Sequence, residues 1–150
     1  MIDVVISRCL LGENCRYDGG ANKIDKLCDI QKKCRLIPVC PEVLGGLDTP
    51  RLPSEIQGNR VVMKDGRDVT EEFLCGAQKA LEIAKGNNCT VAILKAKSPS
   101  CGRDIIYDGS FSGTLTNGDG VFAAVLKRDG LTVFTEKETE KILEFLQEEA

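Results

Sequence analysis

Four short apolar runs, separated by segments with helical periodicity, constrain the fold of this chain more than any other feature. The runs are IDVVIS (2–7), RLIPVC (35–40), TVAILKA (90–96) and LTVF (131–134). Such runs, rich in β-branched residues, are typical of strands buried on both faces of a sheet. Strands that alternate with helices form parallel sheets through right-handed crossovers. The sequence therefore predicts a three-layer α/β fold.

The expected sheet is mostly parallel and Rossmann-like, with about four main strands. Apolar residues at three- and four-residue steps predict helices between the strands, over 22–33, 70–86 and 119–130, and after residue 135. Thr70 and Asp119 are the expected N-caps of the second and third helices. Thr135 and Glu138 have the spacing of a capping box at the start of the last one.

Three further segments are expected to be non-helical. Two turn signals, Gly58-Asn59 and Asp65-Gly66, flank RVVMK and predict a small hairpin at one edge of the sheet. The segment 40–56 carries three prolines and two adjacent glycines, so we expect it to be irregular. The glycine-rich segment 107–120 is expected to be a connection.

Length and composition limit the classes of function. A chain of 150 residues without a repeat or linker predicts a single domain over 1–150. The formal net charge of -3 provides no basic surface for a long nucleic acid. No segment reaches the roughly 20 apolar residues of a membrane-spanning helix. We expect a cytoplasmic protein, and nothing in the sequence predicts an oligomeric state.

The chain has eight cysteines and no histidine, an unusual combination for a cytoplasmic protein. Disulfides are not expected in a reducing compartment, which leaves metal binding, thiol chemistry or burial as small apolar side chains. Cys28, Cys75 and Cys89 lie in or beside predicted helices and strands and are expected to be packing residues. Cys15 lies in the first loop, which we expect over residues 9–23. It could be a spare metal ligand, a sulfur carrier or only a loop residue.

Cys9, Cys40 and Cys101 each stand just beyond the end of a different predicted parallel strand. The carboxyl ends of parallel strands meet at one edge of the sheet, where ligands bind in open α/β folds. Three thiolates without histidine suit soft metal chemistry, and a cluster with one iron free of protein ligands fits this number better than structural zinc, which takes four ligands. Reactive thiols and inert buried cysteines remain the alternatives.

Four segments in order resemble the thiouracil desulfidase family, formerly catalogued as a domain of unknown function. They are CLLGENCRYDG (9–19), VCPEVLGGLDTPRLPSE (39–55), KAKSPSCG (95–102) and IYDGSFSGTLTNGDGV (106–121). The resemblance implies a [4Fe-4S] cluster that is bound by three cysteines and has one open iron. It also implies a non-redox reaction in which the C=S group of a thiolated uracil becomes C=O and sulfide is released.

Matched motif by motif, the resemblance implies that Cys9, Cys40 and Cys101 bind the cluster. It also implies that Glu42 and Ser100 belong to the active site, Glu42 as a general base or proton donor and Ser100 as a group that orients substrate or water. A loop-bracing carboxylate and a turn-forming serine are the alternatives. The chain departs from the family at Arg8, where a small residue is common.

Four more residues are candidate substrate ligands. Arg16 and Arg51 offer planar forks of donors for a carbonyl or a phosphate, although solvated loop charges explain them equally well. Asp18 lies in the first loop within YDG, which is above all a turn signal, and Ser98 flanks Pro99. The expected partner is a small thiolated pyrimidine as base, nucleoside or nucleotide. A binding module with a structural metal and a thiol-based sulfur carrier are the competing functions.

Overall fold

The computed structural model describes residues 1–148, built around a sheet of four parallel strands in the order β2-β1-β5-β8. The strands are β1 (Asp3–Ser7), β2 (Arg35–Val39), β5 (Val91–Leu94) and β8 (Thr132–Thr135). Val4 at the centre of the sheet pairs with Leu36 on one side and with Val91 on the other. Three of the predicted apolar runs contain one of these strands, and the fourth covers all of β8 except Thr135, so the predicted parallel α/β sheet is confirmed.

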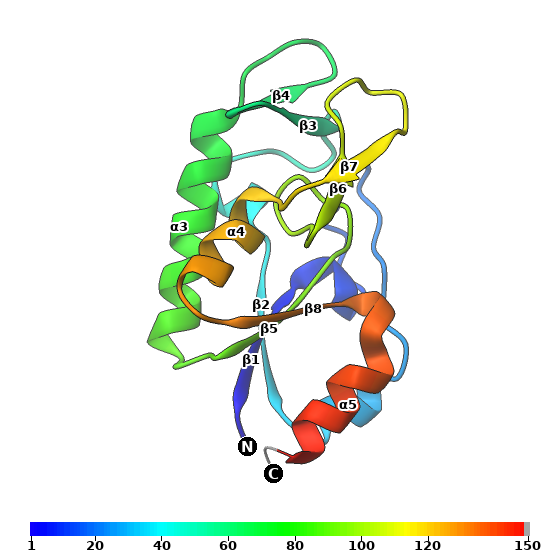
Figure 1. Cartoon of the computed structure of the whole chain (residues 1–150), viewed down its shortest axis with the longest axis vertical. Coiled ribbons are helices and arrows are strands. Elements are labelled where there is room, and N and C mark those ends of the chain that lie inside the picture. Colours follow the sequence, from blue (N-terminus) through cyan, green and yellow to red (C-terminus); the bar gives the residue numbers. More distant parts are fainter. Residues whose placement is uncertain (149–150) are drawn as a thin grey trace.

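Helices cover both faces of the sheet (Figure 1). They are α3 (Thr70–Gly86) and α4 (Val121–Arg128) on one face, and α1 (Leu27–Gln31) and α5 (Thr139–Glu148) on the other. Neighbouring residues of one strand point to opposite faces. Val5 therefore packs with α3 and α4, whereas Val4 and Ile6 pack with α1 and α5. This arrangement confirms the three layers.

Two small antiparallel hairpins lie beyond the end of the sheet toward which β1 runs (Figure 1). They consist of β3 (Ser54–Gln57) with β4 (Arg60–Met63), and β6 (Ile105–Tyr107) with β7 (Leu115–Asn117). The first contains the predicted Gly58-Asn59 turn, but it forms a sheet of its own instead of extending an edge of the main sheet. The second was expected to be a connection.

The predicted helix over 22–33 is wrong in length, since only α1 forms. The backbone N–H groups of Asn22 and Ile24 donate to the carbonyls of Cys9 and Leu10, so this stretch is held by the first loop rather than by helical bonds.

The segment after Cys40 was expected to be irregular, yet it starts with a short helix, α2 (Pro41–Leu44). Proline suits the first helical position, because it lacks the N–H that would have no partner there.

Neither predicted N-cap is confirmed. Val69, not Thr70, occupies the N-cap position of α3. Thr70 is the first residue of α3, and its N–H donates to the Asp68 carboxylate at 2.9 Å. Asp119 does not cap α4, because Gly120 occupies that position. The capping box of Thr135 and Glu138 is confirmed, although it caps the start of the 3-10 turn η2 (Glu136–Glu138), which leads into α5.

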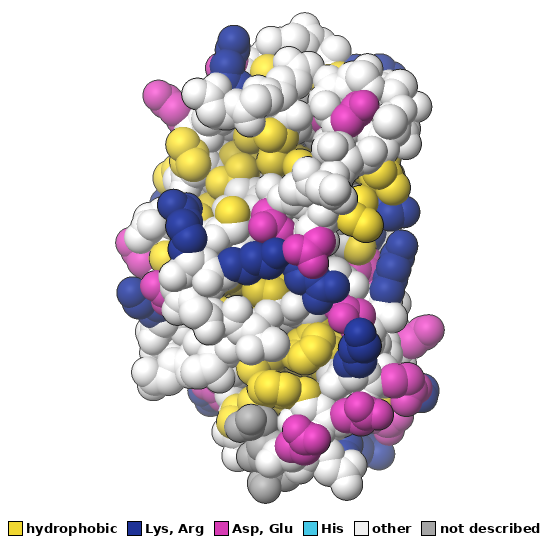
Figure 2. Space-filling view, in the orientation of Figure 1, with side chains coloured by type: hydrophobic (Ala, Val, Ile, Leu, Met, Phe, Trp, Pro, Cys, Tyr) yellow, Lys and Arg dark blue, Asp and Glu magenta, His cyan; other side chains and the backbone are white. Residues whose placement is uncertain are grey.

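The described part of the chain contains no helix with both the length and the apolar character needed to cross a membrane. Acidic and basic side chains are interspersed over the face shown in Figure 2. Charges of both signs therefore mix there, and neither sign forms a continuous patch on this face.

Helices α2 and α3 touch through two glycines. A Cβ atom on Gly76 would lie 1.8 Å from the Pro41 carbonyl oxygen, and one on Gly45 would lie 1.9 Å from the Glu72 carbonyl oxygen. The two backbones can approach this closely only because neither position carries a side chain. The contact fixes α2, and with it Cys40, against the longest helix of the fold.

Replacing Gly76 with alanine should therefore destabilise the protein strongly, because the new methyl group meets backbone that cannot move without shifting α2. We expect the free energy of unfolding to fall by about 3 kcal/mol, at the upper end for overpacking. Gly86→Ala is the control, since no atom lies within 4 Å of its Cβ position, and alanine favours helix by up to about 1 kcal/mol. Urea unfolding measures both, and equal stabilities would contradict the proposed contact.

Candidate active site

A cavity of about 500 Å³ opens at the carboxyl ends of three strands of the sheet. Ser7 at the end of β1, Cys40 after β2 and Lys95 after β5 contribute to its wall. The two hairpins contribute Glu55 from β3 and Phe111 from the loop between β6 and β7. The cavity therefore lies between the sheet and the hairpins, at the edge that parallel topology favours for ligands.

The structure brings all three strand-end cysteines to this cavity. Cys9 lies in the 3-10 turn η1 (Arg8–Leu11) that follows β1, Cys40 is the residue between β2 and α2, and Cys101 lies in the loop after β5. Each is positioned by the end of its own strand, so the parallel pairing of the strands brings them together.

Cys15 is a fourth thiol in the cavity wall, and it contacts Cys9 and Cys40. The Cys40 contact lowers the pKa of Cys15, but the Cys9 contact and burial outweigh it, so this pKa is raised. Contact with Cys15 and burial raise the pKa of Cys40 well above its usual range. Burial raises the pKa of Cys101 to about 12, although contacts with the hydroxyls of Ser7 and Ser100 lower it in part. Binding a metal through these thiols must release protons.

Glu42 lines the cavity and forms an ion pair with Arg51. Arg51 Nε donates to Glu42 Oε2 at 2.9 Å, and Nη2 lies 2.8 Å from the same oxygen. The other contacts of the guanidinium are to the carbonyls of Cys15 and Asp48 and to the Thr49 hydroxyl. Every nitrogen of this guanidinium thus contacts an acceptor of the chain itself, and Arg51 links the first loop to α2.

The serines beside Cys101 differ in their surroundings. The Ser98 hydroxyl accepts hydrogen bonds from the N–H groups of Ser100 and Cys101, at 3.1 and 3.0 Å, and so shapes the turn that presents Cys101. Ser98 also lines the cavity, whereas Ser100 is buried and does not. The Ser100 hydroxyl lies 4.0 Å from the Cys101 sulfur, so it contacts the thiol rather than open space.

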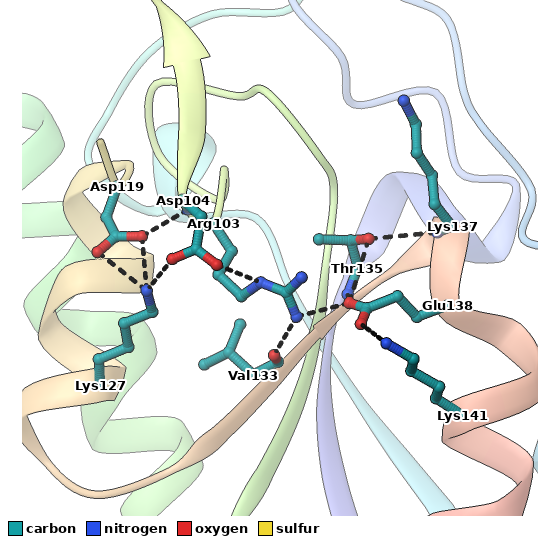
Figure 3. Close-up of polar contacts among 9 residues, drawn as sticks. All are labelled: Arg103, Asp104, Asp119, Lys127, Val133, Thr135, Lys137, Glu138 and Lys141. Carbon is teal, nitrogen blue, oxygen red and sulfur yellow. Dashed lines mark hydrogen bonds and ion pairs between the residues drawn. The ribbon is translucent and has the colours of Figure 1, made fainter. Parts of the chain in front are cut away.

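The segment after Cys101 is tied to the far edge of the sheet by Arg103 (Figure 3). Arg103 Nη1 donates to the Val133 carbonyl on β8 at 2.8 Å and also pairs with the carboxylate of Glu138, the last residue of η2. The side chains of Arg103 and Glu138 are 24% and 17% exposed, so the pair is only partly screened by water. It holds the Cys101 loop against β8 and η2.

A second set of contacts ties the same segment to α4 (Figure 3). Lys127 Nζ on α4 lies between the carboxylates of Asp104 and Asp119, and Asp119 accepts the N–H of Asp104 at 2.7 Å. Gly120 also donates to the Gly102 carbonyl at 2.7 Å. The Cys101 loop is thus fixed from both sides.

Arg16 lines the cavity, but Asp18 does not. Arg16 donates to Asn22 at 2.7 Å and to Asp18 at 3.1 Å, and Asp18 also accepts the N–H of Gly20 at 2.9 Å. Asp18 therefore braces Arg16 and the first loop from behind, while Arg16 faces the space that a substrate would enter.

The thiols suit a group larger than one ion. Within residues 1–148, no three Cys, Asp, Glu or His side chains lie close enough together to hold a single metal ion. The thiols of Cys9, Cys40 and Cys101 nevertheless share one cavity, and thiolates are the usual ligands of iron-sulfur clusters. The donor set therefore fits an iron-sulfur cluster better than a lone ion.

A family profile described as 2-thiouracil desulfurase matches residues 4–138. The chain belongs to the 2-thiouracil desulfurase family. The match includes the cavity wall, from Ser7 at the end of β1 through Gly113, and both hairpins. This family membership confirms the resemblance seen in the sequence.

Two similar proteins can be compared with the chain over nearly its whole length. YbbK of Bacillus subtilis (strain 168), described as an uncharacterized protein, is 44% identical over 153 residues, which cover 93% of this chain and 99% of YbbK. A solved structure described as the [4Fe-4S]-dependent thiouracil desulfidase TudS is 41% identical. It superimposes with a TM-score of 0.92 over 98% of this chain and 99% of its own.

The sequence analysis did not identify several residues that line the desulfurase cavity. Lys95 and Lys97 follow β5, so the strand-end rule that selected Cys101 would also have selected them. Glu55, Tyr107 and Phe111 come from the hairpins, and the sequence carries no signal that places these hairpins over the sheet. These three residues are found only once the positions of the hairpins in the fold are known.

Burial of the remaining cysteines corrects part of the sequence analysis. Cys89 is buried as expected, but Cys28 and Cys75 are exposed. Cys28 lies within α1, but the buried residues of that helix are Leu27 and Ile30, so Cys28 lies off its apolar face. Neither Cys28 nor Cys75 lines the desulfurase cavity.

Replacing Arg51 with methionine should destabilise the protein, because it leaves the carboxylate of Glu42 partly buried and without its cation. The side chains of Arg51 and Glu42 are only 5% and 16% exposed, so we expect a loss of about 3 kcal/mol in the free energy of unfolding. The control is Arg60→Met, which removes an exposed pair with Asp68 and should change stability by less than about 1 kcal/mol. Urea unfolding compares the two, and equal losses would show that the buried pair is not special.

Proposed function

We propose that this protein is a [4Fe-4S]-dependent thiouracil desulfidase, which replaces the C=S group of a thiolated uracil with C=O and releases sulfide without net redox change. The main support for the proposal is that Cys9, Cys40 and Cys101, which follow three different strands, line one cavity. Glu42 lines the same cavity. The match to the desulfurase family and the likeness to TudS support the same activity.

Cys9, Cys40 and Cys101 would hold the cluster, which leaves one iron without a protein ligand. When bound, the cluster supplies a Lewis acid for the thione sulfur and a soft acceptor for the sulfide that leaves. The turn braced by Ser98 and the ion pairs of Arg103 keep Cys101 in place. Ser100 has the role of supporting the Cys101 thiol.

Glu42 acts as the general base. Its Oε2 is held by Arg51, which leaves Oε1 to accept a proton from the water that attacks the ring carbon. The same carboxyl group then returns that proton to the sulfur and takes up the hydroxyl proton as the C–S bond breaks and C=O forms. This second proton goes to the departing HS⁻, so that one water is consumed for each H₂S formed. Arg51 positions Glu42, and Arg16, on the wall of the cavity, is the better candidate for a ligand of the ring carbonyl.

The substrate is a small thiolated pyrimidine, as base, nucleoside or nucleotide. A cavity of about 500 Å³ has the size of small-molecule sites, which range from about 300 to 1,000 Å³. We propose that the chain works as one domain and in the cytoplasm. The eight cysteines are all free, which supports a reducing compartment.

Anaerobic purification with assays of iron and acid-labile sulfide tests the cofactor. We expect a brown protein with about four irons per chain, because the buried thiols offer a ready-made set of soft ligands. Cys101→Ser should lose most of this iron, whereas Cys75→Ser, an exposed position on α3, should keep it. An iron-free protein after cluster reconstitution would favour a thiol-based sulfur carrier acting through Cys15. A loaded protein that is inert on thiolated pyrimidines would favour a binding module.

Glu42→Gln should abolish turnover of 2-thiouracil while the iron content stays unchanged, because the amide cannot take a proton from water. We expect a loss of at least about 100-fold in kcat, the lower end for removing a general base. The control is Glu71→Gln, an exposed carboxylate on α3, which should leave kcat unchanged. Full activity of Glu42→Gln would refute the assignment.

A further inference from the structure

The loop between β6 and β7 brings an aromatic side chain to the cavity. Phe111 and Gly113 of this loop line the cavity wall. Phe111 has a backbone φ of +55°, a left-handed conformation that a bulky residue rarely adopts. Gly109 and Gly113, on either side, also have positive φ, but glycine adopts it without strain. The only strained position of this loop therefore belongs to the aromatic residue that lines the cavity.

A buried carboxylate holds Phe111 in this conformation. Glu55 on β3 is 8% exposed, and its Oε1 accepts the N–H of Gly109 at 2.9 Å and the N–H of Phe111 at 3.2 Å. In the part of the chain that the structure describes, no Lys or Arg forms an ion pair with Glu55. Burying a carboxylate without a cation is unfavourable, and here the two backbone N–H groups are the partners that compensate for it.

Two further contacts dock the loop onto the first hairpin. The amide of Gln57 donates to the Gly109 carbonyl at 2.7 Å. A Cβ atom on Gly109 would lie 2.6 Å from the Ile56 carbonyl oxygen, so only glycine allows this approach. The hairpin β3-β4 thus serves as a platform that sets the position of Phe111 from three neighbouring residues.

We propose that Phe111 packs its ring on the face of the thiolated pyrimidine and that Glu55 is the positioning residue that keeps it there. This inference rests on the proposed function, because it takes the pyrimidine as the ligand of the cavity. A pyrimidine ring is flat and has a π-face, and stacking on an aromatic side chain holds such a ring without contacting its exocyclic groups. The thione and the carbonyl then stay free for the thiol-lined wall and for Glu42.

Steady-state kinetics of the cluster-loaded enzyme on 2-thiouracil tests the role of Phe111. We expect Phe111→Leu to raise KM about tenfold and to leave kcat within twofold, because stacking stabilises bound substrate and transition state alike. Phe111→Tyr keeps the aromatic face and should stay within twofold of the wild-type KM. Equal KM values for the leucine and tyrosine variants would overturn the proposal, since a purely structural side chain has no need of aromaticity.

A spectroscopic measurement covers the case in which Phe111→Leu folds poorly. In loaded enzyme that is deuterated except at its phenylalanines, saturation of the ring protons should transfer to H5 and H6 of uracil, the reaction product. The transfer should disappear in Phe111→Tyr, which removes that labelled ring but keeps the fold. Transfer that persists there, or that is absent from the wild type, would contradict the stacking.

A double-variant cycle tests Glu55 as a positioning residue. Glu55→Gln should raise KM several-fold and accelerate hydrogen exchange of the Phe111 amide at least fivefold, because a neutral acceptor holds that N–H more weakly. Combined with Phe111→Leu it should add no further increase in KM, since Glu55 acts through Phe111. Additive increases would place Glu55 itself on the substrate and overturn its assigned role.

The same experiments separate this inference from the proposed function. If the proposed function fails, the wild-type enzyme itself does not turn over 2-thiouracil, and the kinetic comparison of variants cannot begin. The saturation transfer still reports whether a pyrimidine lies on Phe111. If only this inference fails, the wild type is active and Phe111→Leu matches it.

Discussion

Parallel pairing of β1 with both β2 and β5 is the constraint on which the site depends. Each strand ends at the same edge of the sheet, and each is followed at once by a loop that carries a cysteine. The thiols of Cys9, Cys40 and Cys101 reach one cavity because their strands are in register. Apolar residues that pack against α3, α4 and α5 stabilise this register, so the core determines where the chemistry can occur.

A second level of positioning comes from contacts behind the cavity. Gly45 at the end of α2 and Gly76 on α3 fix the position of Cys40 and Glu42 relative to α3. Arg51 joins α2 to the first loop. Arg103 and Lys127 hold the loop of Cys101 against β8 and α4. None of these contacts needs to touch a substrate. They keep flexible loops at fixed distances from one another, which precise catalytic geometry requires.

The sequence predicted the sheet and the strand-end cysteines because both follow from local patterns. Apolar runs identify buried strands, and the rule for parallel strands then places Cys9, Cys40 and Cys101 at one edge. The hairpins could not be placed in this way, since nothing local says that β3 lies over the cavity or that Phe111 faces it. The helix expected over 22–33 failed for a related reason, because contacts of Asn22 and Ile24 with the first loop override its periodicity.

The order of the strands in the sheet also determines when the site can form. β1 lies between β2 and β5, yet β5 is made about 90 residues after β1. At synthesis rates of about 5 to 20 residues per second, the thiol of Cys9 waits on the order of ten seconds before the strand leading to Cys101 emerges. Contacts this distant in sequence form slowly in folding as well. The thiols of the first loop therefore meet the solvent of a nascent chain long before the cavity closes around them.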